Sequence, residues 1–164
     1  MAENLLILGA GQYGAVAKET AQAMGCFDMI SFLDDNSALA IGNLANYESF
    51  IRDYRYAFVA IGNPALRAEW IYRLEEKGFG LPVLKHPQAT VMPSAQIAGG
   101  SIIEGQALVN SNATIAAGCF ISAGAVVNHN AQLGACCHID CNAVVSAGGT
   151  VPAQTKVPSG TVFH

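Results

Sequence analysis

Charged residues are scarce in this sequence. Only 12% of the 164 residues are charged, with eight Lys or Arg against twelve Asp or Glu, and the formal net charge is −4 at pH 7. From His86 onward the only Lys or Arg is Lys156. A chain without a basic run has little to neutralise the phosphates of a polymer, so a nucleic-acid partner is not expected. A small molecule fits the composition better.

Long hydrophobic runs are also missing. Hydrophobic residues make up 52% of the chain, but Gly, Asn and Pro interrupt the apolar segments before any could span a bilayer. Residues 1–11 contain neither the basic n-region nor the cleavage site of a secretory signal. We therefore expect a cytoplasmic protein without membrane insertion.

The cysteines lack the paired CxxC spacing of a structural zinc site. Four of the five cluster around one histidine, namely Cys119, Cys136, Cys137 and Cys141 around His138. Cys119 and Cys137, however, occupy positions where the repeat described below takes a small buried residue. Five is an odd number, which with no signal peptide argues against a disulfide framework. We expect no metal site.

What the sequence does contain is a period of six. Large apolar residues recur at this spacing without interruption: Val91, Ile97, Ile103, Val109, Ile115, Ile121, Val127, Leu133, Ile139, Val145, Val151, Val157 and Phe163. Two places before each stands a small residue: Ala89, Ala95, Ser101, Ala107, Ala113, Cys119, Ala125, Ala131, Cys137, Ala143, Gly149, Thr155 and Thr161. A six-residue period matches neither a helix nor an ordinary strand. It indicates a parallel β-helix of hexapeptides, in which three repeats close one triangular coil.

The first part of the chain has a different pattern, that of strand, glycine loop and helix. A buried run, Leu5-Leu6-Ile7-Leu8, leads into the GxGxxG turn at residues 9–14, and good helix formers follow to residue 24. Glycine lets a backbone approach a phosphate, and the free amides of a helix N-terminus provide donors. A second strand, 29–33, ends in Asp34 and Asp35, where an acid commonly meets a ribose hydroxyl. The motif predicts nucleotide binding; a tight turn without a ligand is the alternative.

Two more strands complete this first part. One covers residues 56–61 and precedes Pro64, which suits the first turn of a helix extending to Lys77. The other covers residues 81–84. We therefore predict two domains: residues 1–85, a small Rossmann-like βαβ domain of the α/β class, and residues 86–164, an all-β parallel β-helix, short at its C-terminus as in a truncated form.

Two polar features of the repeats stand out. Asparagines are expected in the turns between strands because Asn tolerates left-handed backbone: Asn110, Asn112, Asn128, Asn130 and Asn142. His129 and His138 lie nine residues apart, which is half of an eighteen-residue coil. They therefore cannot stack in one ladder of a single subunit. Either both are surface histidines, or a neighbouring subunit brings one close to the other.

Together these segments resemble a known family. The GAGQYG loop, FLDD, AIGNPALR, KHPQATVMPSA, the hexapeptides and VVNHNAQLGACCHID are similar to the bacterial sugar O-/N-acyltransferases. That group includes the UDP-4-amino-sugar N-acetyltransferases and the sialic-acid O-acetyltransferases. The resemblance implies a left-handed β-helix, a homotrimer with the site between subunits, and acetyl-CoA as co-substrate without a metal.

The family's functional residues can be placed on this sequence. Gly11, Gln12 and Tyr13 would hold the diphosphate of a nucleotide-sugar. Asp34 and Asp35 would contact the uridine, and Gly62 would line the sugar end. His129 would be the general base, next to Asn130 where the family usually has Asp or Glu. His138 and the Ala147 backbone would contact acetyl-CoA.

The expected activity is acetyl transfer from acetyl-CoA to the amine of a UDP-4-amino-sugar. A neutral imidazole suits this step because it accepts a proton near physiological pH. O-acetylation of a sialic-acid type of sugar is the alternative reaction. Two non-catalytic alternatives also remain, a trimer that only binds a nucleotide and a purely structural trimer.

Overall fold

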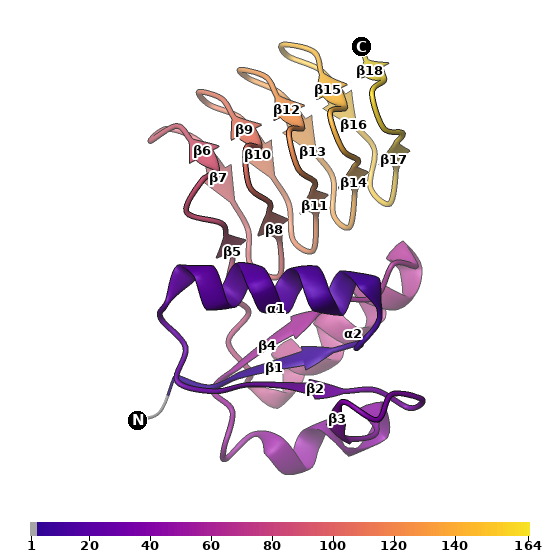
Figure 1. Ribbon diagram of the computed structural model, residues 1–164. Coiled ribbons are helices and arrows are strands. Elements are labelled where there is room, and N and C mark those ends of the chain that lie inside the picture. The colour runs from indigo at the N-terminus through magenta and orange to yellow at the C-terminus, as the bar shows by residue number, and fades with distance from the viewer. Residues whose placement is uncertain (1–2) are drawn as a thin grey trace. The chain divides into compact units, whose positions relative to one another are not determined.

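The computed structural model describes residues 3–164. These residues divide into two compact units, one that ends at Pro82 and one that spans Val83–His164. The first contains a parallel sheet flanked by helices, and the second contains stacked short strands (Figure 1). The strand expected over 81–84 differs: β5 spans Leu84–Lys85 and pairs with β8 in the second unit. Pro82 has no N–H to donate to a ladder, and only an isolated bridge, Tyr56 to Gly80, extends the first sheet here.

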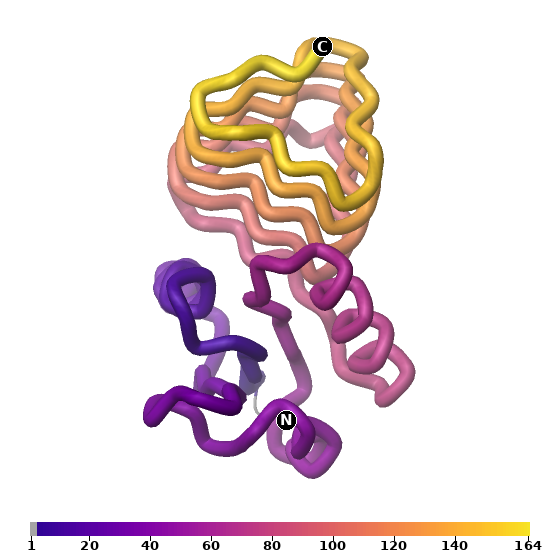
Figure 2. The backbone as a smooth tube through the Cα atoms, turned by 90° about the vertical axis from the view of Figure 1, so that its right-hand side faces the viewer, coloured from indigo at the N-terminus to yellow at the C-terminus, as the bar shows by residue number. Residues whose placement is uncertain are grey.

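The sheet of the first unit has four parallel strands in the order β3-β2-β1-β4. Their bounds are β1 Leu5–Leu8, β2 Ile30–Leu33, β3 Ala40–Gly42 and β4 Tyr56–Val59. Helix α1 spans Gln12–Met24, α2 spans Pro64–Lys77, and a 3-10 helix, η1, spans Leu44–Phe50. Helices α1 and α2 cover opposite faces of this sheet (Figures 1 and 2). The predicted strand–glycine loop–helix order is confirmed; β3 and η1 carried no periodic signal.

Strand β1 is the centre of this unit. All four of its side chains are fully buried, as expected for a central parallel strand covered on both faces. Helix α2 begins as its sequence predicts: the side chain of Asn63 accepts from the Leu66 amide at 2.9 Å, and Pro64 occupies the first turn. Helices α1 and α2 end at Gly25 and Gly78, both in the left-handed conformation.

The second unit is a parallel β-helix with three faces. Its sheets have the orders β16-β13-β10-β7, β17-β14-β11-β8-β5 and β18-β15-β12-β9-β6, with every pairing parallel. After β5 the strands are two residues each: Thr90–Val91, Gln96–Ile97, Ile102–Ile103, Leu108–Val109, Thr114–Ile115, Phe120–Ile121, Val126–Val127, Gln132–Leu133, His138–Ile139, Val144–Val145, Thr150–Val151, Lys156–Val157 and Val162–Phe163, for β6 to β18. The fold is consistent with a left-handed β-helix, as the resemblance implies.

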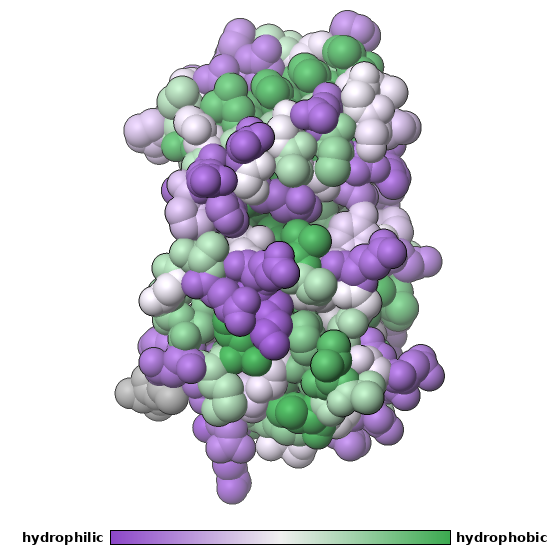
Figure 3. All heavy atoms as spheres, in the orientation of Figure 1, coloured by the Kyte–Doolittle hydropathy of each residue, from purple (hydrophilic) through white to green (hydrophobic). Residues whose placement is uncertain are grey.

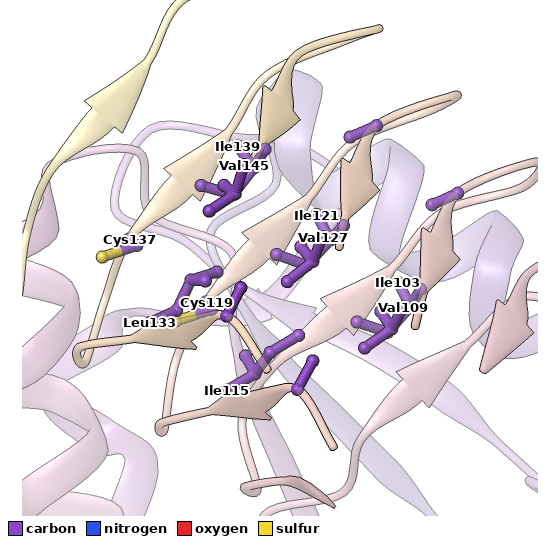
Figure 4. Packing of buried hydrophobic residues seen from close by; sticks show 14 of the residues in the cluster. Ile103, Val109, Ile115, Cys119, Ile121, Val127, Leu133, Cys137, Ile139 and Val145 are labelled. Carbon is purple, nitrogen blue, oxygen red and sulfur yellow. The ribbon is translucent and has the colours of Figure 1, made fainter. Parts of the chain in front are cut away.

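Each of these strands ends on a residue of the six-residue series. Ladder partners lie eighteen residues apart, as in Ile121 with Ile103 and Ile139. Figure 4 shows these three side chains at equivalent places in successive coils, with Val109, Val127 and Val145 forming another ladder. The small residues of the series in the middle coils, such as Cys119 and Cys137, are fully buried beside them. The period therefore fixes both the strands and the core.

The corners of the β-helix repeat a backbone conformation. Every sixth residue from 100 to 160 has positive φ: Gly100, Gln106, Asn112, Gly118, Gly124, Asn130, Cys136, Asn142, Gly148, Gln154 and Gly160. Gly and Asn adopt this left-handed region at low cost. The expectation of left-handed asparagines holds for three of the five; Asn110 and Asn128 instead accept with their side chains from the next backbone amide.

The surfaces of both units mix polar and apolar side chains. On the face drawn in Figure 3, hydrophilic and hydrophobic residues are interspersed over each unit. Within residues 3–164, no helix is both long enough and apolar enough to cross a bilayer.

Candidate functional site

The glycine loop of the first unit is packed against its own backbone. A Cβ on Gly14 would lie 2.2 Å from the Gly9 carbonyl oxygen, and one on Gly9 would lie 2.9 Å from that of Ala60. Gly11, at the N-cap of α1, has open space around its would-be Cβ and no side-chain cap. The outer glycines therefore shape the loop, and the N-terminus of α1 carries the partial positive charge that suits an anion.

Asp34 holds this loop in place. One carboxylate oxygen accepts from the Ala10 amide and the other from the Asn36 amide, both at 2.8 Å. The Ala10 bond in the first place, and then the Asn36 bond, lower the pKa of Asp34 below its ordinary value. Asp35 is engaged similarly, since it accepts from the Leu44 amide at 2.9 Å. Both carboxylates support the backbone around the predicted nucleotide site, a role that the sequence did not indicate.

Gly62 and Tyr13 come together beside the loop. A Cβ on Gly62 would be 3.4 Å from the Tyr13 ring, which is ordinary van der Waals contact, so the two residues are direct neighbours. Arg67, buried in α2, donates from Nη1 to the carbonyls of Ile61 at 2.8 Å and Gly62 at 3.1 Å. A buried guanidinium thus fixes the segment that follows β4. The arginine is in AIGNPALR, but its role is visible only in the fold.

His129 lies at an exposed corner of the β-helix, between β12 and β13. Its backbone amide donates to Asn128 Oδ1 at 2.8 Å, and Asn128 Oδ1 also accepts from Asn110 Nδ2 at 3.2 Å. Its ring atom Nδ1 lies 3.2 Å from Asn130 Nδ2. The asparagines below and beside the histidine therefore position both its backbone and its ring.

Ala147 stands one coil after His129 at the same corner. The two are joined through the next residue, since the Gly148 amide donates to the His129 carbonyl at 2.9 Å. Two predicted site residues therefore share one corner within a single chain. His138 lies on a different part of the coil, in β14.

His138 has a polar environment. Its Nε2 is 3.0 Å from Ser122 Oγ and 3.7 Å from Asp140 Oδ1, while its ring meets Phe120 edge-on. Because Ser122 and Asp140 approach the same nitrogen, the three do not form a catalytic relay, which needs both ring nitrogens. Burial opposes ionisation of Asp140, but the Cys141 amide, Lys156 and His138 outweigh it and lower its pKa to about 2.

Glu104 and Lys156 extend this group of residues. Lys156 Nζ lies 3.0 Å from Asp140 Oδ2. Glu104 accepts from the Ala123 amide at 3.1 Å, and burial raises the pKa of its carboxyl group. Glu104, Ser122 and Asp140 follow each other at intervals of eighteen residues, so counting by coils would have found them in the sequence. Among residues 3–164, no group of three His, Cys, Asp or Glu side chains could hold a metal ion.

Comparisons with known proteins place this geometry in context. The family model described as PglD N-terminal domain matches residues 4–74. The acetyltransferase domain of PglB from Neisseria gonorrhoeae FA1090, solved in complex with acetyl coenzyme A, is 32% identical; the match covers 99% of this chain and 88% of that one, with a TM-score of 0.80.

Two further solved structures share the fold. PerB from Caulobacter crescentus, solved in complex with CoA and GDP-perosamine, is 25% identical over 100% of this chain and 90% of its own, with a TM-score of 0.88. WeeI from Acinetobacter baumannii AYE has 16% identity and a TM-score of 0.60, covering 98% of this chain and 96% of its own. That last likeness concerns the fold alone.

Proposed function

The chain belongs to the family of hexapeptide-repeat β-helix sugar N-acetyltransferases, and we propose that it transfers the acetyl group of acetyl-CoA to the amine of a nucleotide-linked sugar. The observation that carries this proposal is the 32% identity, over 99% of the chain, to an acetyltransferase domain solved with acetyl coenzyme A. The complex of PerB with CoA and GDP-perosamine supports an amino sugar on a nucleotide as the acceptor.

The first unit is proposed to bind the nucleotide-sugar. The amides of Gly11, Gln12 and Tyr13 begin α1, and their partial positive charge suits a diphosphate. Asp35 and the backbone supported by Asp34 would contact the base and ribose, with Gly62 and Tyr13 at the sugar end. Among nucleotide-linked amino sugars we favour a UDP-linked 4-amino sugar, the acceptor that the sequence resemblance implies.

The β-helix is proposed to carry out the chemistry. His129 would take a proton from the acceptor amine as its nitrogen attacks the thioester carbonyl, so that a C–N bond forms while the C–S bond breaks. A general base of this kind contributes about 10² to 10⁴ in rate. His138 and the Ala147 backbone would contact acetyl-CoA. A homotrimer would allow His129 of one chain to meet the acetyl-CoA held by His138 of a neighbour, because half a coil separates them in one chain.

The reaction is tested by following thiol release from acetyl-CoA with UDP- and GDP-linked sugars, each with and without a free amine. We compare the natural chain with His129→Ser, because Ser111 already occupies that corner one coil earlier. Amine-dependent release that falls by about 10² or more in His129→Ser would support the proposal. Release with hydroxyl-only sugars would point to O-acetylation. Nucleotide-sugar binding without any release would contradict acetyl transfer.

The nucleotide site is tested separately with Gly11→Ala. The residue has φ of −83° and nothing within 4 Å of its would-be Cβ, so the substitution should leave folding unchanged. A Cβ at this point would obstruct a phosphate approaching the α1 amides. Calorimetric titration with the nucleotide-sugar should show weaker binding, whereas the affinity for acetyl-CoA should not change. Equal nucleotide affinity in both proteins would place the diphosphate elsewhere.

A further inference from the structure

Arg67 carries a positive charge in the interior of the first unit, with only 1% of its surface exposed. It is the fourth residue of α2, where the partial positive charge of the helix N-terminus opposes a cation. Burial adds a second cost, because an ionised group loses its hydration. Nη1 offsets part of both costs by donating to the carbonyls of Ile61 at 2.8 Å and Gly62 at 3.1 Å. The fold therefore holds a positive charge where two effects disfavour one.

This charge lies next to the predicted nucleotide site. Strands β1 and β4 are parallel neighbours, so the glycine loop after β1 and the segment after β4 leave the sheet at the same edge. The two are in close contact, since a Cβ on Gly9 would lie 2.9 Å from the Ala60 carbonyl oxygen. The guanidinium of Arg67 binds the next two carbonyls of that segment. Residues 60–62 therefore connect the buried charge to the glycine loop.

The opposite side of the glycine loop is negative. Strand β2 pairs with the other edge of β1, and Asp34 at its end accepts from the Ala10 amide at 2.8 Å. Asp35 follows directly, while residues 9–14 contain no Lys or Arg. A diphosphate at the α1 amides would therefore meet two carboxylates, against which the helix N-terminus supplies only about half an elementary charge. An anion site of this composition requires a further positive charge.

On the premise of the proposed function, we propose that Arg67 is the buried counter-charge of the nucleotide-sugar site. Without touching the ligand, its guanidinium strengthens the binding of the diphosphate and positions the segment that contains Gly62. A charge inside a protein acts over several ångström, because the medium around it screens less than water does. A nucleoside without phosphates would benefit only from the positioned segment. The affinity of a nucleoside diphosphate relative to its nucleoside therefore measures the contribution of the charge.

NMR titrations of the full chain with UDP and with uridine measure this ratio without turnover. Arg67→Met removes the charge at similar side-chain length, so the preference for UDP over uridine should fall about tenfold. Arg67→Lys keeps a charge and donors but not the planar shape, so the preference should stay within about twofold of the natural value. An unchanged preference in Arg67→Met would overturn the proposal, even if both ligands bound more weakly.

Two other cations of the first unit provide matched controls. Arg73 belongs to the same helix but is exposed and paired with Glu69, so Arg73→Met should change the preference by less than about twofold. Lys18 in α1 is the competing source of charge, with Nζ 5.3 Å from the centre of the Phe32 ring. Lys18→Met should have a smaller effect than Arg67→Met. A larger effect would assign the counter-charge to Lys18 and overturn the proposal for Arg67.

The natural chain allows a test that does not depend on the folding of a variant. Salt screens a buried charge less than exposed ones, so UDP affinity should fall by less than about threefold between about 0.05 M and about 0.5 M salt. A steeper fall would mean that exposed cations hold the diphosphate, and it would overturn the proposal. Failure of the proposed function is distinguishable. A natural chain that does not prefer UDP to uridine lacks the diphosphate site, whereas a preference that persists in Arg67→Met excludes only the role of Arg67.

Discussion

The two units differ in whether their structural features are repeated along the chain. In the first unit every part of the predicted nucleotide site occurs once, from the loop at Gly9 to the Asp34 carboxylate. In the β-helix each position has counterparts eighteen residues away. Three such counterparts, one per coil, donate to a carbonyl fifteen residues further on: Ser101 to Ala116, Cys119 to Gly134 and Cys137 to Pro152. Each position of the β-helix can therefore be compared with the equivalent position of another coil, whereas positions in the first unit have no such equivalent.

Comparing successive coils of the β-helix also separates the positions that form the core from those of the proposed site. We call residues at equivalent positions of successive coils a column. In a column of the core the residue type stays the same, as in Ile103, Ile121 and Ile139. In the columns with the proposed site residues the character changes at every coil: Ser111, His129 and Ala147 at the corner, and Phe120, His138 and Lys156 on the face. Because His129 and His138 differ from the residues one coil before and after them, stacking alone does not explain these two histidines.

In the first unit the largest effect is expected at Gly14, a position at which no other residue fits. In Gly14→Ala the new Cβ would lie 2.2 Å from the Gly9 carbonyl oxygen, so the loop or α1 must move. Overpacking costs about 1–3 kcal/mol or more, although alanine is the better helix former by about 1 kcal/mol. Chemical denaturation should therefore show the first unit destabilised. Gly11→Ala is the control, and a more stable Gly14→Ala protein would contradict the packing.

A comparable loss of stability is expected in the β-helix when one residue of a ladder is truncated. Ile121 is fully buried between Ile103 and Ile139. Truncation to Ala should lower the free energy of unfolding by about 2–5 kcal/mol, because transfer and cavity terms add. Ile121→Val, which copies the neighbouring ladders, should cost about 0.5–1.5 kcal/mol. If both variants lost a similar free energy of unfolding, the ladders would tolerate cavities. The repeated positions of the β-helix would then be less informative as comparisons than we suggest.

A smaller effect is expected for Asp34→Asn. The amide can still accept from Asn36, but it cannot accept from Ala10 with its NH₂ group, which costs about 1 kcal/mol. The pKa of Asp34 is lowered in the fold, so its carboxylate stabilises the protein above the ordinary pKa and loses this effect as pH falls through the lowered value.

The pH dependence of unfolding checks this sign. The difference between the natural chain and Asp34→Asn should be largest near neutral pH and should shrink below about pH 4. Asp35→Asn is the matched control, since its amide oxygen can keep the single bond to the Leu44 amide. A difference that grows on acidification would exclude the assigned role of Asp34.

The smallest effect should follow Cys119→Ser. Ser101, one coil earlier in the same column, is fully buried and already donates to the corresponding carbonyl. The hydrogen bond with Cys137, together with burial, raises the pKa of the Cys119 thiol, so it remains protonated and inert. We expect a stability change of about 1 kcal/mol or less and unchanged acetyl transfer. A loss of activity would indicate a role for the thiol that the column does not show.

The sequence predicts the β-helix almost completely, because its signal is geometric. Each large apolar residue from Val91 to Phe163 is the second residue of a two-residue strand. Burial follows from the same count except towards the ends of the β-helix, where Val91, Ile97 and Phe163 are only partly buried. In the first unit β1 and α1 are predicted by their apolar run and glycine loop, but β3 and η1 are not, since packing on β2 and α2 decides them rather than periodicity.

The sequence nominates the candidate site residues, but it does not predict the contacts that those residues make. Asn130 follows His129 in the sequence, yet whether their side chains meet depends on the positive φ of Asn130. The anchoring of Ala10 by Asp34 joins residues twenty-four apart and depends on how the loop curves back. Such contacts depend on the tertiary structure and cannot be read from the spacing of residues in the sequence.

The constant ladder spacing of the β-helix has a consequence for how that unit forms. Each coil closes on the previous one across eighteen residues, as the pairing of His138 with Phe120 illustrates. The entropy lost in closing a loop depends on its length, so each coil added costs nearly the same. The unit can therefore grow in the direction of protein synthesis, with each finished coil serving as the template for the next. Its folding rate should depend on the first coil, and its unfolding should begin by fraying at an end.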